Sequence, residues 1–68
     1  MRETLIKALL SHAQGNLNKH LANIEVYMNS TTGIGEHSDI VETLALELDK
    51  AAQYHDQIEI IKQNFIKS

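Results

Sequence analysis

The sequence contains no cysteine and no proline, and only three of its 68 residues are glycine. The lack of cysteine excludes disulfides, thiolate zinc sites and a cysteine nucleophile, and it is compatible with a reducing, cytoplasmic setting. The lack of proline leaves few positions at which a helix must end. A core of this size rarely contributes more than about 3–5 kcal/mol without disulfides, metal or oligomerisation, so we expect the chain to associate.

Long hydrophobic runs and clustered positive charge are also missing. No run of about 18 apolar residues occurs, and charged residues flank the first short apolar pair, so we expect neither a membrane span nor a secretion signal. Six Lys and Arg residues are scattered along the chain against nine acidic residues, which gives a net charge of −3. Because phosphate backbones are bound by clustered basic residues, we expect no nucleic-acid partner.

One segment interrupts a sequence that otherwise suits helices. Residues 29–38 concentrate poor helix formers, and Gly33 can adopt the left-handed conformation that ends a helix. Ser38 or Asp39 can then cap a second helix, with Glu42 at capping-box spacing from Asp39. The sequence therefore predicts one all-α domain, an antiparallel two-helix hairpin. Its expected bounds are residues 1–68, with a helix over about 2–31, a turn over about 32–38 and a helix over about 39–66.

Both predicted helices carry an apolar stripe at alternating steps of three and four residues, which is the spacing of coiled-coil-like helices. A histidine interrupts each stripe, His20 in the first and His55 in the second. We expect these stripes to form the core seam of the hairpin or of a dimer. The predicted seam residues are Ile6, Leu10, Ala13, Leu17, His20, Ile24 and Tyr27, and then Val41, Leu44, Leu48, Ala51, His55, Ile58 and Phe65.

Further apolar residues widen both stripes beyond what one neighbouring helix can cover. A helix contacts one neighbour in a hairpin but two in a four-helix bundle, so the width predicts a homodimer that forms such a bundle. Leu46 and Ile60 fall on the far side of the second helix, where they are either lone exposed residues or part of a further contact. The widening residues are Leu5, Leu9, Leu21 and Met28, and then Ile40, Ala52, Ile61 and Ile66.

The four histidines raise the question of a metal site, but the predicted hairpin does not bring them together. His20 and His55 would lie about 9 Å apart along the axis, so we assign no metal ligands and expect no cofactor. A lone histidine in an apolar stripe is more typical of a hydrogen-bonded or register-setting residue that responds to acid. No glycine-rich phosphate loop or catalytic assembly is present, so we expect no enzyme activity.

Most of residues 12–65 resemble small uncharacterised helical proteins encoded by tailed marine cyanophages. The resemblance implies a viral source, with the host cytoplasm or the virion as the location and a host or phage protein as a partner. It implies no reaction mechanism. The segments that carry it are residues 23–29, 33–40, 47–50 and 54–56, of which the turn sequence GIGEHSDI is the most specific.

Three functions follow as hypotheses. The first is a non-enzymatic protein-interaction module, a dimeric bundle that presents its acidic second helix or its turn to another protein. The second is a virion or assembly component that contributes a helical hairpin, and the third is a histidine-dependent metal or pH-responsive binder. Loops on rigid scaffolds often carry function. The predicted interaction residues are therefore those of the turn, Gly33, Ile34, Gly35, Glu36, His37, Ser38 and Asp39.

Overall fold

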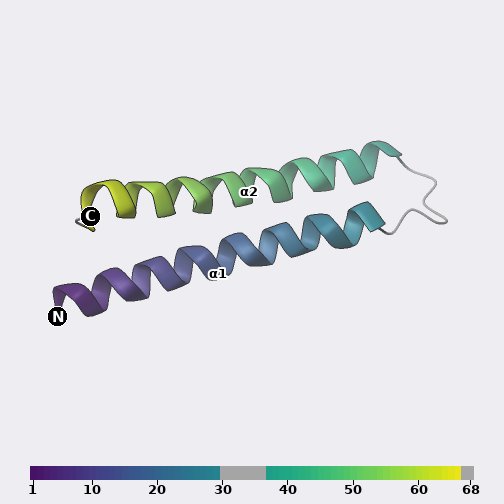
Figure 1. Cartoon of the computed structure of the whole chain (residues 1–68). Helices are drawn as coiled ribbons and strands as arrows, with labels where there is room; N and C mark the ends of the chain where they lie inside the picture. Colours follow the sequence, from purple (N-terminus) through teal and green to yellow (C-terminus); the bar gives the residue numbers. More distant parts are fainter. Residues whose placement is uncertain (30–36, 67–68) are drawn as a thin grey trace.

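The computed structural model of the chain describes residues 1–29 and 37–66, the side chains of His37 and Ser38 excepted. Over these residues it contains two α-helices, α1 (Arg2–Asn29) and α2 (His37–Asn64), and no strand. Figure 1 shows the two helices side by side and running in opposite directions. The predicted all-α, antiparallel two-helix hairpin is confirmed, and α2 begins two residues before its predicted start.

The ends of the helices carry residues that suit the helix dipole. Glu3 lies in the first turn of α1 and Asp39 in the first turn of α2, where the positive end of the dipole favours acids. Lys62 lies in the last turn of α2, where a cation is favoured. The backbone N–H of Phe65 donates to the carbonyl of Ile61 at 2.9 Å, so the hydrogen-bond pattern continues just past the end of α2.

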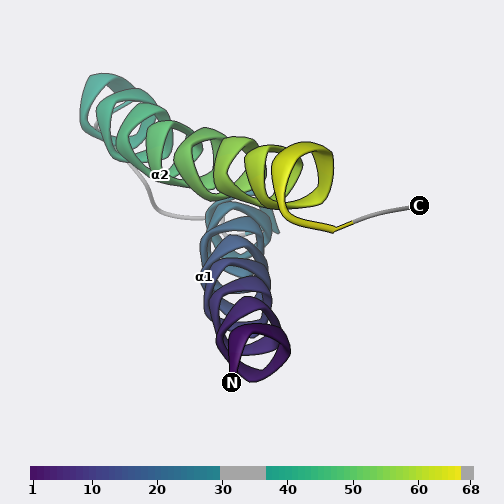
Figure 2. The ribbon, with the colours of Figure 1, turned by 90° about the vertical axis from the view of Figure 1, so that its left-hand side faces the viewer.

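The hairpin is long and thin. Each helix has 28 residues, which corresponds to about 42 Å at about 1.5 Å per residue. The radius of gyration is 15.6 Å, whereas a compact domain of this length has about 11 Å. Figure 2 shows that no third described element covers the sides of the pair, so much of each helix faces away from the other. Neither helix has a stretch long and apolar enough to cross a membrane.

The fully buried part of the seam is small. Four apolar residues form it, and none of their side chains is completely enclosed. In α1 the predicted stripe lies at the seam except for Tyr27, which is exposed. The buried residues are Ala13, Ala51, Ile58 and Ile61, together with the polar His20. Ile6, Leu10, Leu17 and Ile24 are half-buried.

In α2 the predicted stripe is partly wrong as a seam between the two helices. Leu44, Ala51 and Ile58 are buried or half-buried as predicted, but four of the seven residues are exposed. The observed stripe instead runs one residue earlier at three of its positions. The exposed residues are Val41, Leu48, His55 and Phe65, and the residues that take part in their place include Ile40, Glu47, Tyr54 and Ile61.

The physical reason for the shift is the cost of burying polar groups. The observed stripe buries Ile61 and leaves Lys62 exposed, whereas the predicted stripe would turn the lysine inward without a partner for its ammonium group. The observed stripe also brings the Glu47 carboxylate to the His20 ring, so that both polar groups are hydrogen-bonded. The placement of Val41, Leu48 and His55 in a dimer seam stays a prediction.

Candidate functional site

Five polar side chains form a cluster across the middle of the seam, His12, His20 and Asn23 from α1 and Glu47 and Tyr54 from α2. His20 is only 6% exposed, and its Nδ1 lies 2.7 Å from Oε1 of Glu47. The side-chain amide of Asn23 donates to the same oxygen at 3.0 Å. One carboxylate oxygen of α2 therefore accepts hydrogen bonds from two residues of α1 that are three positions apart.

Aromatic contacts fix the orientation of the His20 ring within this polar cluster. The ring lies nearly parallel to that of Tyr54, with an interplanar angle of 7° and 6.0 Å between the ring centroids. His12 meets the same tyrosine edge-on, with centroids 6.2 Å apart and an angle of 71°. Both geometries are typical of favourable aromatic pairs. Tyr54 thus links two turns of α1 and holds His20 with Nδ1 toward Glu47.

The electrostatics of the polar cluster favour an ionised carboxylate. The hydrogen bond from His20 and then that from Asn23 hold the pKa of Glu47 below its ordinary value of 4.5, while partial burial opposes this shift. Because an ionised carboxylate can only accept, the hydrogen of this bond lies on Nδ1 of His20. The sequence-based interpretation of His20 as a hydrogen-bonded residue of the stripe is therefore confirmed, since a carboxylate faces its ring.

The chemistry of the polar cluster is hydrogen bonding. Over the described residues, no three His, Asp or Glu side chains gather where they could hold a metal ion. Every buried side-chain nitrogen and oxygen in that part of the chain has a hydrogen-bond partner. His55, the second predicted core histidine, is exposed and separate from His20. The arrangement suits a clamp that fixes the register of the two helices.

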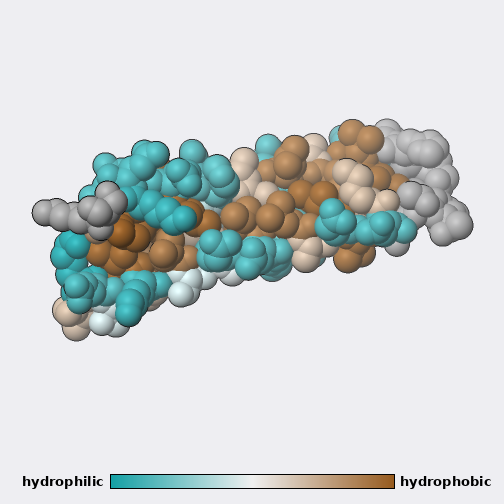
Figure 3. Space-filling view, in the orientation of Figure 1, coloured by the Kyte–Doolittle hydropathy of each residue, from teal (hydrophilic) through white to brown (hydrophobic). Residues whose placement is uncertain are grey.

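A second feature is an apolar face on one long side of the hairpin. Leu21 follows His20 by one position, about 100° around α1, and so lies on the flank opposite to Asn23. Leu48 follows Glu47 in the same way, and this places both leucines on the side away from the Asn23–Glu47 contact. Figure 3 shows a hydrophobic band along the junction of the two helices. The exposed residues of the apolar face are Leu21, Met28, Val41 and Leu48, and the half-buried Leu10, Leu17 and Leu44 lie beneath them.

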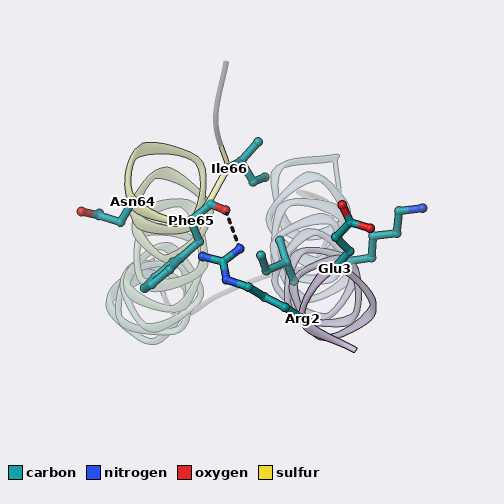
Figure 4. A pocket seen from close by; sticks show the side chains of 7 residues that line it. Arg2, Glu3, Asn64, Phe65 and Ile66 are labelled. Atoms are coloured by element: carbon teal, nitrogen blue, oxygen red, sulfur yellow. Dashed lines mark hydrogen bonds between the residues drawn. The ribbon is translucent and has the colours of Figure 1, made fainter.

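A third feature is a groove between the helix ends far from the turn, here named the open-end groove. Its lining is almost wholly apolar, and Arg2 is the residue with a charged side chain among those that line it. Arg2 also lines a neighbouring, more polar hollow and donates from Nη1 to the carbonyl of Phe65 at 3.4 Å (Figure 4). The groove is lined by Met1, Arg2, Leu5, Ile6, Leu9, Ile61 and Phe65.

The predicted turn site is only partly described. Gly33, Ile34, Gly35 and Glu36 lie outside the described residues. His37 and Ser38 belong to the first turn of α2, where nothing is stated of their side chains. Asp39 is exposed in that turn. The structure therefore does not test an interaction at the turn, which stays a prediction.

Sequence reasoning missed four residues of the polar cluster, which are His12, Asn23, Glu47 and Tyr54. Glu47 had an alternative explanation as a surface partner of Lys50, three residues later on the same helix. A usable signal was present, because a hairpin centred near residue 34 or 35 places His20 opposite residues 48 and 49, beside Glu47. The sequence pattern could therefore have predicted that a buried histidine lies close to an acidic residue of the other helix.

Comparison with models of protein families, with curated proteins and with solved structures finds no match to this chain. Functional conclusions therefore depend on the geometry and the surface chemistry of the hairpin itself.

Proposed function

We propose that this chain is a non-enzymatic helical interaction module whose first partner is a second copy of itself, with two hairpins forming a four-helix bundle. The observation that carries the proposal is the apolar face, where large hydrophobic side chains of both helices stay exposed beside a seam that buries only a few residues. The polar cluster supports a structural role over a catalytic one, because its buried polar atoms are occupied by one another.

The amount of exposed surface supports a dimer. The hairpin exposes 5406 Å², whereas a folded monomer of 7.7 kDa exposes about 4,300 Å² by the usual scaling with mass. The excess is about 1,100 Å² per chain. A standard specific interface buries about 800 Å² per partner, so one face-to-face contact can bring the exposed area into the normal range.

The positions of the exposed residues fit a two-fold contact. Val41, Leu48 and His55 follow one another at intervals of seven residues, so they share one flank of α2. In a bundle of two hairpins this flank meets the partner, and each helix gains the second neighbour that its wide stripe requires. The residues that are exposed in the single hairpin then take the dimer-seam position that the sequence predicts for them.

A charge placed on the apolar face tests this proposal. We expect Leu48→Lys to convert the dimer into a poorly helical monomer, because the ammonium group would be buried at the centre of the interface. Val26→Lys is the matched control, since Val26 lies on the outer side of α1 and is 64% exposed, compared with 60% for Leu48. The measurements are sedimentation equilibrium and circular dichroism over a dilution series in about 1 M salt, where exposed charges are screened.

Equal association of Leu48→Lys and Val26→Lys would contradict the apolar face as the interface. A wild-type chain that remains monomeric, fully helical and cooperatively melting on dilution would contradict self-association itself.

We also propose that the protein is viral, and the resemblance to cyanophage proteins is what supports this proposal. Within that setting the module acts either on a host or phage protein in the host cytoplasm or as a component of the particle. Abundance of the chain in purified particles supports the component role. Recovery with a partner from infected lysate, together with absence from particles, supports the cytoplasmic role.

A further inference from the structure

Two exposed apolar features are left over when the apolar faces of two hairpins are paired. One is the open-end groove, which lies on the flank that carries the Asn23–Glu47 contact, opposite to the apolar face. The other is Leu46, which follows the half-buried Leu44 by two positions, about 200° around α2, and is 64% exposed. Both therefore remain accessible in the proposed four-helix bundle.

The open-end groove combines an apolar floor with a positively charged residue in its lining. Leu5 and Leu9 are largely exposed along one wall, Phe65 is exposed on the other, and Ile61 is buried beneath them. The guanidinium of Arg2 donates to the carbonyl of Phe65, and both residues line the groove, so a positive charge lies close to it. α1 as a whole carries three basic against two acidic residues.

The surroundings of Leu46 have the opposite charge. Glu42 lies about one turn before Leu46 on the surface of α2, and Asp49 and Lys50 lie about one turn after it, so two carboxylates and one ammonium group surround the leucine. α2 carries six acidic residues against two lysines. A large apolar side chain on a surface of net negative charge thus matches an apolar groove whose lining includes Arg2.

We propose that Leu46 of one copy inserts into the open-end groove of another copy, with Glu42 and Asp49 placed against Arg2. This contact joins two different surfaces, so it is heterologous and leaves a free groove and a free Leu46 at the two ends of the assembly. Repetition of such a contact builds a ring where the rotation between copies closes and an open chain where it does not. The chain would then self-associate through two surfaces of opposite charge, the Leu46 surface and the open-end groove. This contact does not involve the apolar face.

Charge reversal with complementation tests the heterologous contact. In wild type we expect the weight-average mass to rise with protein concentration in about 0.1 M salt and to fall back in about 1 M salt, where the Debye length is about 3 Å. Arg2→Glu alone makes the groove acidic, and E42K/D49K alone makes the Leu46 surface basic, so neither variant should grow by itself. An equimolar mixture of the two should grow again, because each groove then meets a surface of opposite charge.

Lys19→Glu and Glu25→Lys are the matched controls, since they change the charge of exposed residues of α1 outside the groove and should leave growth unchanged. Leu46→Ser should abolish the rise in mass in about 0.1 M salt while its circular dichroism stays that of the wild type. A constant mass at every wild-type concentration, or a mixture that does not grow, overturns the heterologous contact and assigns the groove to another occupant. The mass of the wild-type species in about 1 M salt tests the proposed dimer separately, because the charge-dependent contact is screened there.

Discussion

The half of the seam near the open end and the half near the turn are built from different chemistry. Toward the open end, Ala13, Ile58 and Ile61 are buried, and all three side chains are apolar. Toward the turn, the buried side chain among the described residues is His20, held by Glu47. Apolar contacts are favourable in many registers, whereas the histidine–carboxylate contact is made in one. The first half contributes free energy and the second contributes specificity.

The polar half is specific because its alternatives are costly. A slide of α1 along α2 by one turn would move His20 and Asn23 away from Glu47 together, since both bind the same oxygen. A buried polar group without a partner loses the hydration that it had in water and gains nothing in return. The same principle underlies the use of single polar residues to fix register in coiled coils.

The largest expected effect comes from truncating a buried side chain in the apolar half of the seam, which lowers the free energy of unfolding. Ile58→Ala should destabilise the protein by about 2–4 kcal/mol, because the residue is 5% exposed and its truncation leaves a cavity in the seam. This is comparable to the whole stability of a domain of this size, so we expect little helix at room temperature. Circular dichroism against denaturant, at one fixed protein concentration because association changes Tm, provides the measurement.

The control for this change lies two residues away. Ile60 is 51% exposed on the outer side of α2, and Ile60→Ala should change the stability by no more than about 0.5 kcal/mol. Similar losses of stability in the two alanine variants would show that burial in the seam is not the main source of hydrophobic stabilisation.

The next effect concerns the polar half and its coupling. His20→Leu and Glu47→Leu should each lower Tm, because each leaves the other residue without its main partner. The double variant should recover most of the loss, since a leucine pair can replace a buried polar pair without leaving a group unpaired. A double-mutant cycle from thermal melts measures the coupling. Strict additivity would mean that His20 and Glu47 do not act as a pair.

A smaller effect is the pH dependence contributed by Glu47. Its pKa is lower in the folded protein than the ordinary 4.5, so its stabilising contribution is complete above that value. The contribution is lost as the pH falls through the lower folded pKa. We therefore expect the Tm difference between wild type and Glu47→Gln to be largest near about pH 7 and to shrink below about pH 4. A difference that grew on acidification would have the wrong sign for this carboxylate.

The smallest expected effect concerns the intrinsic helix propensity of α1, which contributes to its stability independently of packing. A side chain added at Gly15 would meet no atom within 4 Å, so Gly15→Ala should stabilise α1 by about 0.5–1 kcal/mol through helix propensity alone. The exposed Ala22 gives the reciprocal control, because Ala22→Gly should cost about the same amount. A Tm that does not rise in the first variant would point to a role for Gly15 outside the hairpin.

The two helices and their antiparallel order could be predicted, because periodicity and the absence of proline are local properties of the sequence. The seam of α1 could also be predicted, with His20 in it and Tyr27 as the exception. The seam of α2 could not be predicted. The stripe through Leu48 and the stripe through Glu47 share three residues, and their other residues are adjacent in the sequence. Choosing between them requires the partner helix, because a glutamate favours the seam only when donors face it.

Two long amphipathic helices folded back on each other follow from local properties of the chain. Hydrogen bonding within each helix and the spacing of apolar residues depend on near neighbours in the chain. Only the tertiary structure decided which face of α2 turns inward, that His20 is partnered, and which hydrophobic residues stay exposed. These outcomes depend on contacts between residues 24 to 63 positions apart, such as Asn23 with Glu47 and Arg2 with Phe65, which no local pattern encodes.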